Sequence, residues 1–154
     1  MTSFLNAKMK HFSTLTIFFL VLLCSCEGPD EKLSNQIQGT YFSEKSLTDG
    51  SVQSTQATYY KRGTFAFLMS LSKLDPETGE PLEVKVTVSG KWNVKEGFLH
   101  YNISNVSVEP AFLQQVFENE IRTKNTPDKI VEVDAQKLVV QNSQGEVLTY
   151  TKTE

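Results

Sequence analysis

Cysteine and histidine are scarce in this chain of 154 residues. It has two cysteines, Cys24 and Cys26, and two histidines, His11 and His100. No thiol follows Cys26, so a Cys-His dyad in the body of the chain is excluded, and a Ser-His-Asp triad would depend on His100 alone. A lone histidine without a cysteine pair also lacks the ligand spacing of a transition-metal site. We therefore predict a non-catalytic protein with no metal and no cofactor.

Positive charge is also scarce, because the chain has 15 basic residues and 18 acidic ones. This balance argues against a nucleic-acid partner, which requires a basic surface. The eight glycines do not gather into a phosphate-binding loop. The acidic loop 75–80 holds three carboxylates, but Pro76 and its short length do not match an EF-hand calcium loop. It is expected to be a solvated hairpin tip.

The first residues have the parts of a secretory signal. Lys8, Lys10 and His11 precede an apolar run at 15–23, and small residues follow. The run of about nine apolar residues is shorter than the roughly 20 that a membrane-spanning helix needs. We predict that residues 1–25 are a removable signal peptide. Met9 offers an alternative translation start, which would leave the mature product unchanged.

The end of this leader, Leu23-Cys24-Ser25-Cys26, resembles the bacterial lipobox. Ser25 suits the small position and Leu23 the aliphatic one, whereas a modified Cys24 would put Leu23 in the small position. The resemblance implies that Cys26 carries a lipid that anchors the protein to a membrane. The alternative is a disulfide or free thiols in a cytosolic protein, but cysteines this close cannot staple a domain.

Three segments follow from these observations: the signal peptide, the lipidated Cys26 with a flexible tether over 26–36, and one domain over 37–154. The tether is polar and contains Gly28 and Pro29, with little to bury. The domain is long enough for a hydrophobic core. Glu27 does not match the inner-membrane retention signal, so we expect a cell-envelope protein anchored to the outer membrane.

The domain shows a hydrophobic period near two, which is typical of half-buried β-strands. The residues that share an apolar face are Leu82, Val84, Val86 and Val88 in one run, Phe65, Phe67, Met69 and Leu71 in another, and Leu99, Tyr101 and Ile103 in a third. Turn residues separate the runs at 48–50, 62–63, 75–80, 89–90, 96–97 and 142–145. The last three strands are expected near 129–134, 137–141 and 147–152. The pattern predicts an antiparallel up-and-down meander of about eight strands that closes into a barrel.

One segment, from 110 to 123, has helical spacing instead. Its apolar stripe consists of Phe112, Leu113, Val116, Phe117 and Ile121. Pro110 suits a first helical position. We predict one helix here that braces one end of the barrel, with a moving lid as the alternative.

Short motifs of the domain resemble those of the small lipocalin-like domains of bacterial lipoproteins. They are Gly39-Thr40-Tyr41 at the first strand, Lys61 to Phe65, Gly90-Lys91-Trp92, and the closing hairpin at 138–147. The resemblance implies a mainly β, lipocalin-like barrel whose apolar interior can hold a small ligand. The sequence departs from the family in placing Tyr41 where lipocalins carry Trp, Lys152 where they carry Arg, and the helix before the closing strands.

The candidate ligand-binding residues are large apolar side chains expected inside the barrel. They are Phe65, Phe67, Met69, Val84, Val86, Trp92 and Tyr101. If the barrel is hollow, these side chains bind a small apolar ligand through buried area. If it is filled, they form the core, and the protein would be an envelope module for protein–protein interaction. The sequence leaves both functions open.

Overall fold

The computed structural model describes residues 28–75 and 77–153. The predicted signal peptide, residues 1–25, and the predicted lipidation site, Cys26, lie outside these ranges. Across the described part of the chain, no helix combines the length and hydrophobicity needed to cross a membrane.

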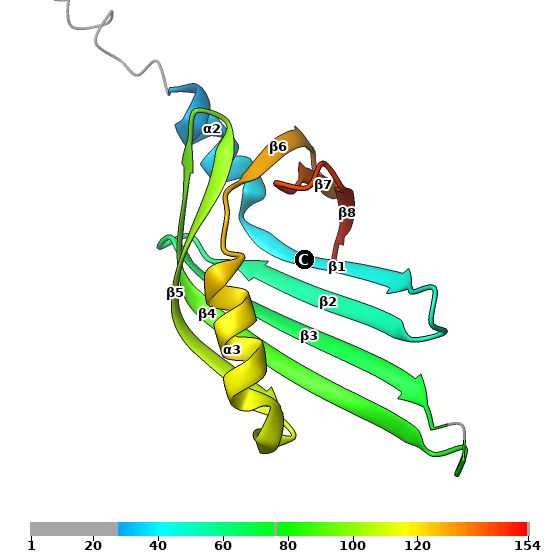
Figure 1. Cartoon of the computed structure of the whole chain (residues 1–154). Helices are drawn as coiled ribbons and strands as arrows, with labels where there is room; N and C mark the ends of the chain where they lie inside the picture. Colours follow the sequence, from blue (N-terminus) through cyan, green and yellow to red (C-terminus); the bar gives the residue numbers. More distant parts are fainter. Residues whose placement is uncertain (1–27, 76, 154) are drawn as a thin grey trace, which may run out of the picture.

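Eight antiparallel strands form a closed barrel in chain order, and β8 pairs back onto β1 (Figure 1). The strands are β1 (Gly39–Ser46), β2 (Val52–Tyr59), β3 (Thr64–Leu74), β4 (Pro81–Lys95), β5 (Phe98–Glu109), β6 (Asp128–Val133), β7 (Lys137–Gln141) and β8 (Val147–Lys152). The helices are α2 (Pro29–Ile37), the 3-10 turn η1 (Ala111–Leu113) and α3 (Gln114–Thr123). The predicted mainly β, up-and-down barrel of about eight strands is confirmed. The helix near 110–123 is also confirmed, and α2 is an additional one.

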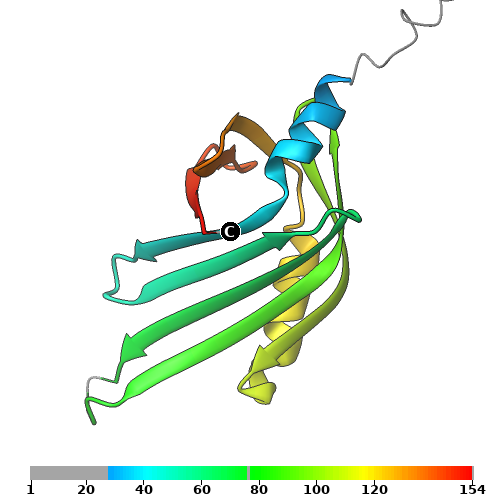
Figure 2. The ribbon, with the colours of Figure 1, turned by 180° about the vertical axis from the view of Figure 1, so that it is seen from behind.

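The barrel is uneven, because the strands from β3 to β5 are long and those from β6 to β8 are short (Figure 2). Strand β5 pairs with β6 only through Phe98 and Leu99, at its beginning. Beyond that point, α3 runs beside β5 (Figure 1). The barrel wall is therefore made of strands, except along the later part of β5, where α3 stands in the place of a neighbouring strand.

The alternating apolar residues face the interior, as the period of two predicts. On β4, Val86 and Val88 are only 4% and 2% exposed, and they pair with Val108 and Val106 of β5. Leu82 belongs to the same face but is 56% exposed. The reason is that β3 and β4 extend past the shorter strands (Figure 2), which leaves Leu82 largely uncovered.

The predicted turn at Ser89-Gly90 is wrong, because both residues lie inside β4. The register with β5 shifts between them, which marks a β-bulge. Gly90 is required there, since a Cβ on it would lie 2.1 Å from the backbone oxygen of Asn102. The glycine thus marks a close approach of two strands rather than a chain reversal.

The predicted flexible tether over residues 26–36 is wrong from Pro29 onward, where α2 begins. Ile37 is fully buried, and Leu33 packs against the barrel core. The Asp30 carboxylate accepts hydrogen bonds from the backbone N–H groups of Glu96 and Gly97, at 2.8 and 3.1 Å. The helix therefore covers the end of the barrel where the β4–β5 turn lies. Its two apolar residues were too few to show this in a polar sequence.

Helix α3 supplies hydrogen bonds to the edge of β5 that β6 leaves unpaired. The Gln114 side chain accepts from the Val108 N–H and donates to the Val106 carbonyl, both at 2.8 Å. Further along, Arg122 donates to the Ile103 carbonyl at 3.3 Å, and Asn125 donates to the Tyr101 carbonyl at 3.0 Å. The helix thus takes the place of a strand in the wall. The prediction that it braces a barrel end is wrong, and α2 does this instead.

Candidate functional site

A cavity of about 710 Å³ lies between the concave face of the long strands and α3, and it is partly open to solvent. Its apolar wall comes from the inward residues of β3, β4 and β5 and from two side chains of α3, Phe117 and Ile121. The turn residues Asn142, Ser143 and Gln144, between β7 and β8, close it from another side. Alternation along the strands places the apolar side chains here, since every second residue of a barrel strand points inward.

Six of the seven candidate ligand-binding residues line this cavity. They are Phe65, Phe67, Met69, Val84, Val86 and Tyr101. Trp92, the seventh, does not line it. This residue is 7% exposed and sits on the far side of Tyr59, in an edge-to-face contact with 5.4 Å between ring centres. The β4 bulge lies between Val88 and Trp92. Trp92 therefore belongs to the end of the barrel that α2 covers, which we call the packed end.

Aromatic rings form the floor that separates the cavity from the packed end. Phe65 and Phe67 have ring centres 4.6 Å apart, and each contacts Tyr101, at 5.3 and 5.4 Å. Tyr59 contacts Phe67 on one side and Trp92 on the other. Such edge-to-face contacts stabilise an aromatic cluster beyond its buried area. The floor is therefore a closely packed aromatic surface that an apolar group can contact.

Polar groups meet at the floor where Tyr101 reaches it. The hydroxyls of Tyr59 and Tyr101 are 2.9 Å apart and share a hydrogen bond. Asp128, the first residue of β6, lines the cavity beside Tyr101. Burial raises the pKa of Asp128 to about 6, and a hydrogen bond from the Tyr101 hydroxyl opposes this rise. Burial also raises the pKa of both tyrosines well above the ordinary range, so both remain protonated donors.

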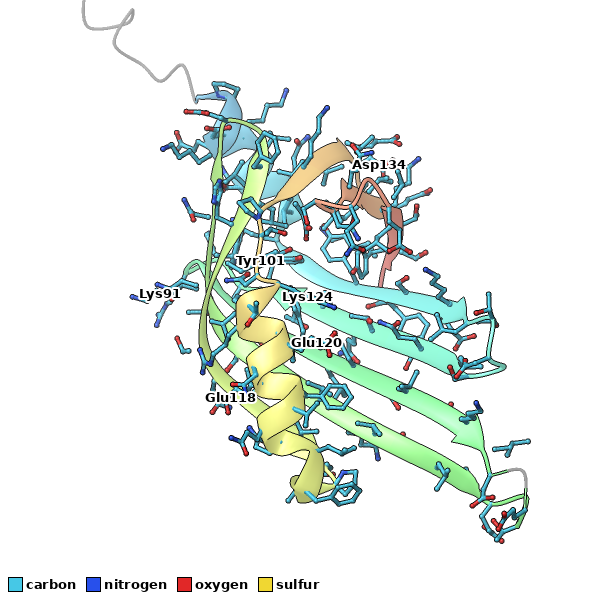
Figure 3. All side chains as sticks on the ribbon, in the orientation of Figure 1. Lys91, Tyr101, Glu118, Glu120, Lys124 and Asp134 are labelled. Atoms are coloured by element: carbon cyan, nitrogen blue, oxygen red, sulfur yellow. The ribbon has the colours of Figure 1, made fainter. Side chains whose placement is uncertain are left out.

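At the rim, charge comes from the last turn of α3 and the residue after it. The Lys124 ammonium lies 2.7 Å from the Glu120 carboxylate, and both side chains are largely exposed. Figure 3 labels both residues near the C-terminal end of α3, with Tyr101 close to that end. Because this pair neutralises itself, it adds little net charge to the cavity.

His100 lies on β5 opposite Asn93 and does not line the large cavity. Across residues 28–75 and 77–153, no group of three or more His, Cys, Asp or Glu side chains is placed to hold a metal ion. The described residues therefore offer no metal centre from which to build a mechanism.

Sequence reasoning missed the part of the cavity that does not come from long strands. Phe117 and Ile121 were assigned to the helix stripe, but the stripe does not show what it packs against. Asp128 and the 142–144 turn carried no signal, because they reach the cavity only through the barrel closure. The apolar stripe of this helix follows a strand that also has an apolar face. This was the one feature of the sequence that could have indicated that the helix forms part of the cavity wall.

The fold and the cavity define a small up-and-down β-barrel with a hollow, mainly apolar interior that is sealed at one end by α2. No protein-family profile and no curated protein sequence matches this chain.

Proposed function

We propose that this protein is a non-catalytic, lipocalin-like lipoprotein of the cell envelope that holds a small apolar ligand in its barrel. The observation that supports this proposal is the cavity of about 710 Å³, whose walls include Phe67, Met69, Val84 and Ile103. Ligand sites of 300–1,000 Å³ with apolar walls and a few polar groups are typical of small-molecule binding proteins. A hollow interior favours this function over the alternative of an interaction module with a filled barrel.

The lipid on Cys26 would attach the protein to a membrane, with the outer membrane as the expected location. Its support is the leader and the Leu23-Cys24-Ser25-Cys26 motif. In the described structure, α2 covers the packed end of the barrel, so the chain reaches the domain at that end (Figure 1). A tether there leaves the cavity free of the attachment point, as a ligand carrier or sensor requires.

Ligand binding is tested with N-phenyl-1-naphthylamine, whose fluorescence rises in apolar surroundings. The full-length chain, made by cell-free synthesis without processing enzymes, is titrated as wild type, Met69→Trp and Leu68→Trp. Met69 lines the cavity, whereas its neighbour Leu68 is exposed on the outer face. We expect wild type and Leu68→Trp to bind the probe and Met69→Trp to lose binding while remaining folded. Equal binding by both variants, or none by wild type, would overturn the proposal.

The anchor is tested separately by feeding cells an alkyne fatty acid and detecting its attachment. Cys24→Ala is the matched control for Cys26→Ala, because the two cysteines are two positions apart. Label should remain in wild type and Cys24→Ala and disappear from Cys26→Ala. A labelled Cys26→Ala protein would exclude Cys26 as the lipidated residue.

A further inference from the structure

Among the described residues, Asp128 is the one carboxylate at the floor of the cavity. It is half-buried, opens β6 opposite Leu99, and stands beside the aromatic cluster of Phe65, Phe67 and Tyr101. The other cavity-lining carboxylate, Glu120, is at the exposed rim. A charged group beside an apolar floor is unusual, because burial of an ionised carboxylate is costly unless a partner compensates it.

No cation of the described chain pairs with Asp128. The six ion pairs among the described residues involve other carboxylates, and the lysine that lines the same cavity, Lys124, pairs with Glu120. The charges of Lys124 and Glu120 cancel, so Asp128 leaves the interior with one uncompensated negative charge. The pKa of about 6 leaves this carboxylate mostly ionised at neutral pH.

Tyr101 and Asp128 line the cavity together, and Tyr59 is joined to Tyr101. The Tyr59 and Tyr101 hydroxyls share a hydrogen bond of 2.9 Å, and Tyr101 lowers the pKa of Asp128 against the larger effect of burial. An ionised carboxylate accepts about four hydrogen bonds, so it retains lone pairs for a donor on a ligand.

We infer that the ligand is a lipophilic amine, whose protonated nitrogen binds Asp128 while its apolar body lies against Phe67, Met69 and Val86. The inference rests on the proposed function and specifies its ligand class. A protonated amine supplies both the donor and the positive charge that the cavity lacks. A neutral alcohol supplies only the donor, and a fatty acid would place a second negative charge beside the first.

The test compares decylamine, 1-decanol and decanoate, which share one chain and differ in the head group. Each displaces N-phenyl-1-naphthylamine from the full-length chain in the wild-type, Asp128→Asn and Glu44→Gln forms. Asparagine keeps the size and an acceptor oxygen but removes the charge. Glu44→Gln is the matched control, because it removes the charge of an exposed carboxylate on β1 that does not line the cavity.

We expect wild type and Glu44→Gln to bind decylamine at least about tenfold more tightly than decanol, and decanoate most weakly. In Asp128→Asn, decylamine and decanol should bind within about threefold of each other, while decanol affinity stays at its wild-type value. If decanol matches decylamine in wild type, or the preference survives in Asp128→Asn, the amine inference is overturned but ligand binding stands. If the naphthylamine probe itself does not bind, the proposed function fails.

Discussion

The Lys152 ammonium lies 5.4 Å from the centre of the Tyr41 ring, and the two residues are register partners across the β1–β8 seam. Lys152 also donates a hydrogen bond of 2.7 Å to the Gln38 carbonyl. The pair therefore places a cation over an aromatic ring where the barrel closes. Tyr41 is fully buried, which makes the seam a part of the core.

Replacement of Lys152 by Met should lower the free energy of unfolding by about 1–2 kcal/mol, because it removes the cation–π contact and the hydrogen bond to Gln38. Lys152→Arg should retain most of the stability, since it keeps the charge over the ring. Urea denaturation measures both variants. A double-mutant cycle with Tyr41→Leu isolates the contact, and strict additivity in that cycle would show that the two side chains do not interact.

Gln114 tests whether α3 is attached to β5 through side-chain hydrogen bonds. Gln114→Leu leaves the Val108 N–H and the Val106 carbonyl without their partner and should cost about 1–3 kcal/mol. Gln115→Leu, at the exposed neighbouring position, should change stability by less than about 0.5 kcal/mol. Hydrogen exchange at the Val108 amide should accelerate only in the first variant. Unchanged exchange there would contradict the proposed attachment.

Gly90 tests the close approach of β4 and β5 at the bulge. Gly90→Ala places a Cβ at 2.1 Å from the Asn102 oxygen, so the backbone must shift. We expect a loss of about 3 kcal/mol or more, at or beyond the upper end of typical overpacking costs. Gly28→Ala is the control, because nothing lies within 4 Å of its Cβ position, and it should cost at most about 1 kcal/mol. Similar melting temperatures for both variants would exclude the clash.

Asp128 makes stability depend on pH in a defined direction. Its folded pKa of about 6 lies above the unfolded value of 3.8, so the folded state binds the proton more tightly. The contribution of this group to stability is therefore highest below pH 3.8 and is lost as pH rises through 6. Asp128→Asn should raise the free energy of unfolding by about 1–3 kcal/mol at pH 7.5 and by almost nothing at pH 3. An equal gain at both pH values would show that the carboxylate charge is not responsible.

The alternating strands were predictable in detail, because the alternation of apolar and polar residues along each strand shows which of its faces is buried. Val84, Val86 and Val88 on β4 and Phe65, Phe67 and Met69 on β3 needed no knowledge of their neighbours. Prediction failed where a local signal has two physical meanings. Gly90 has the composition of a turn and instead permits close strand contact, and α2 has the composition of a linker but buries Leu33 and Ile37.

The sequence by itself determined the up-and-down order of the strands, the helix after β5 and most of the apolar cavity wall. These features follow from periodicity, and periodicity is a property of neighbours along the chain. Only the tertiary structure decided that the interior is hollow, that α3 completes the wall, and that Asp128 stands beside Tyr101 on the cavity floor. The reason is that these features depend on where short strands stop pairing and which distant residues the closure of the barrel brings together.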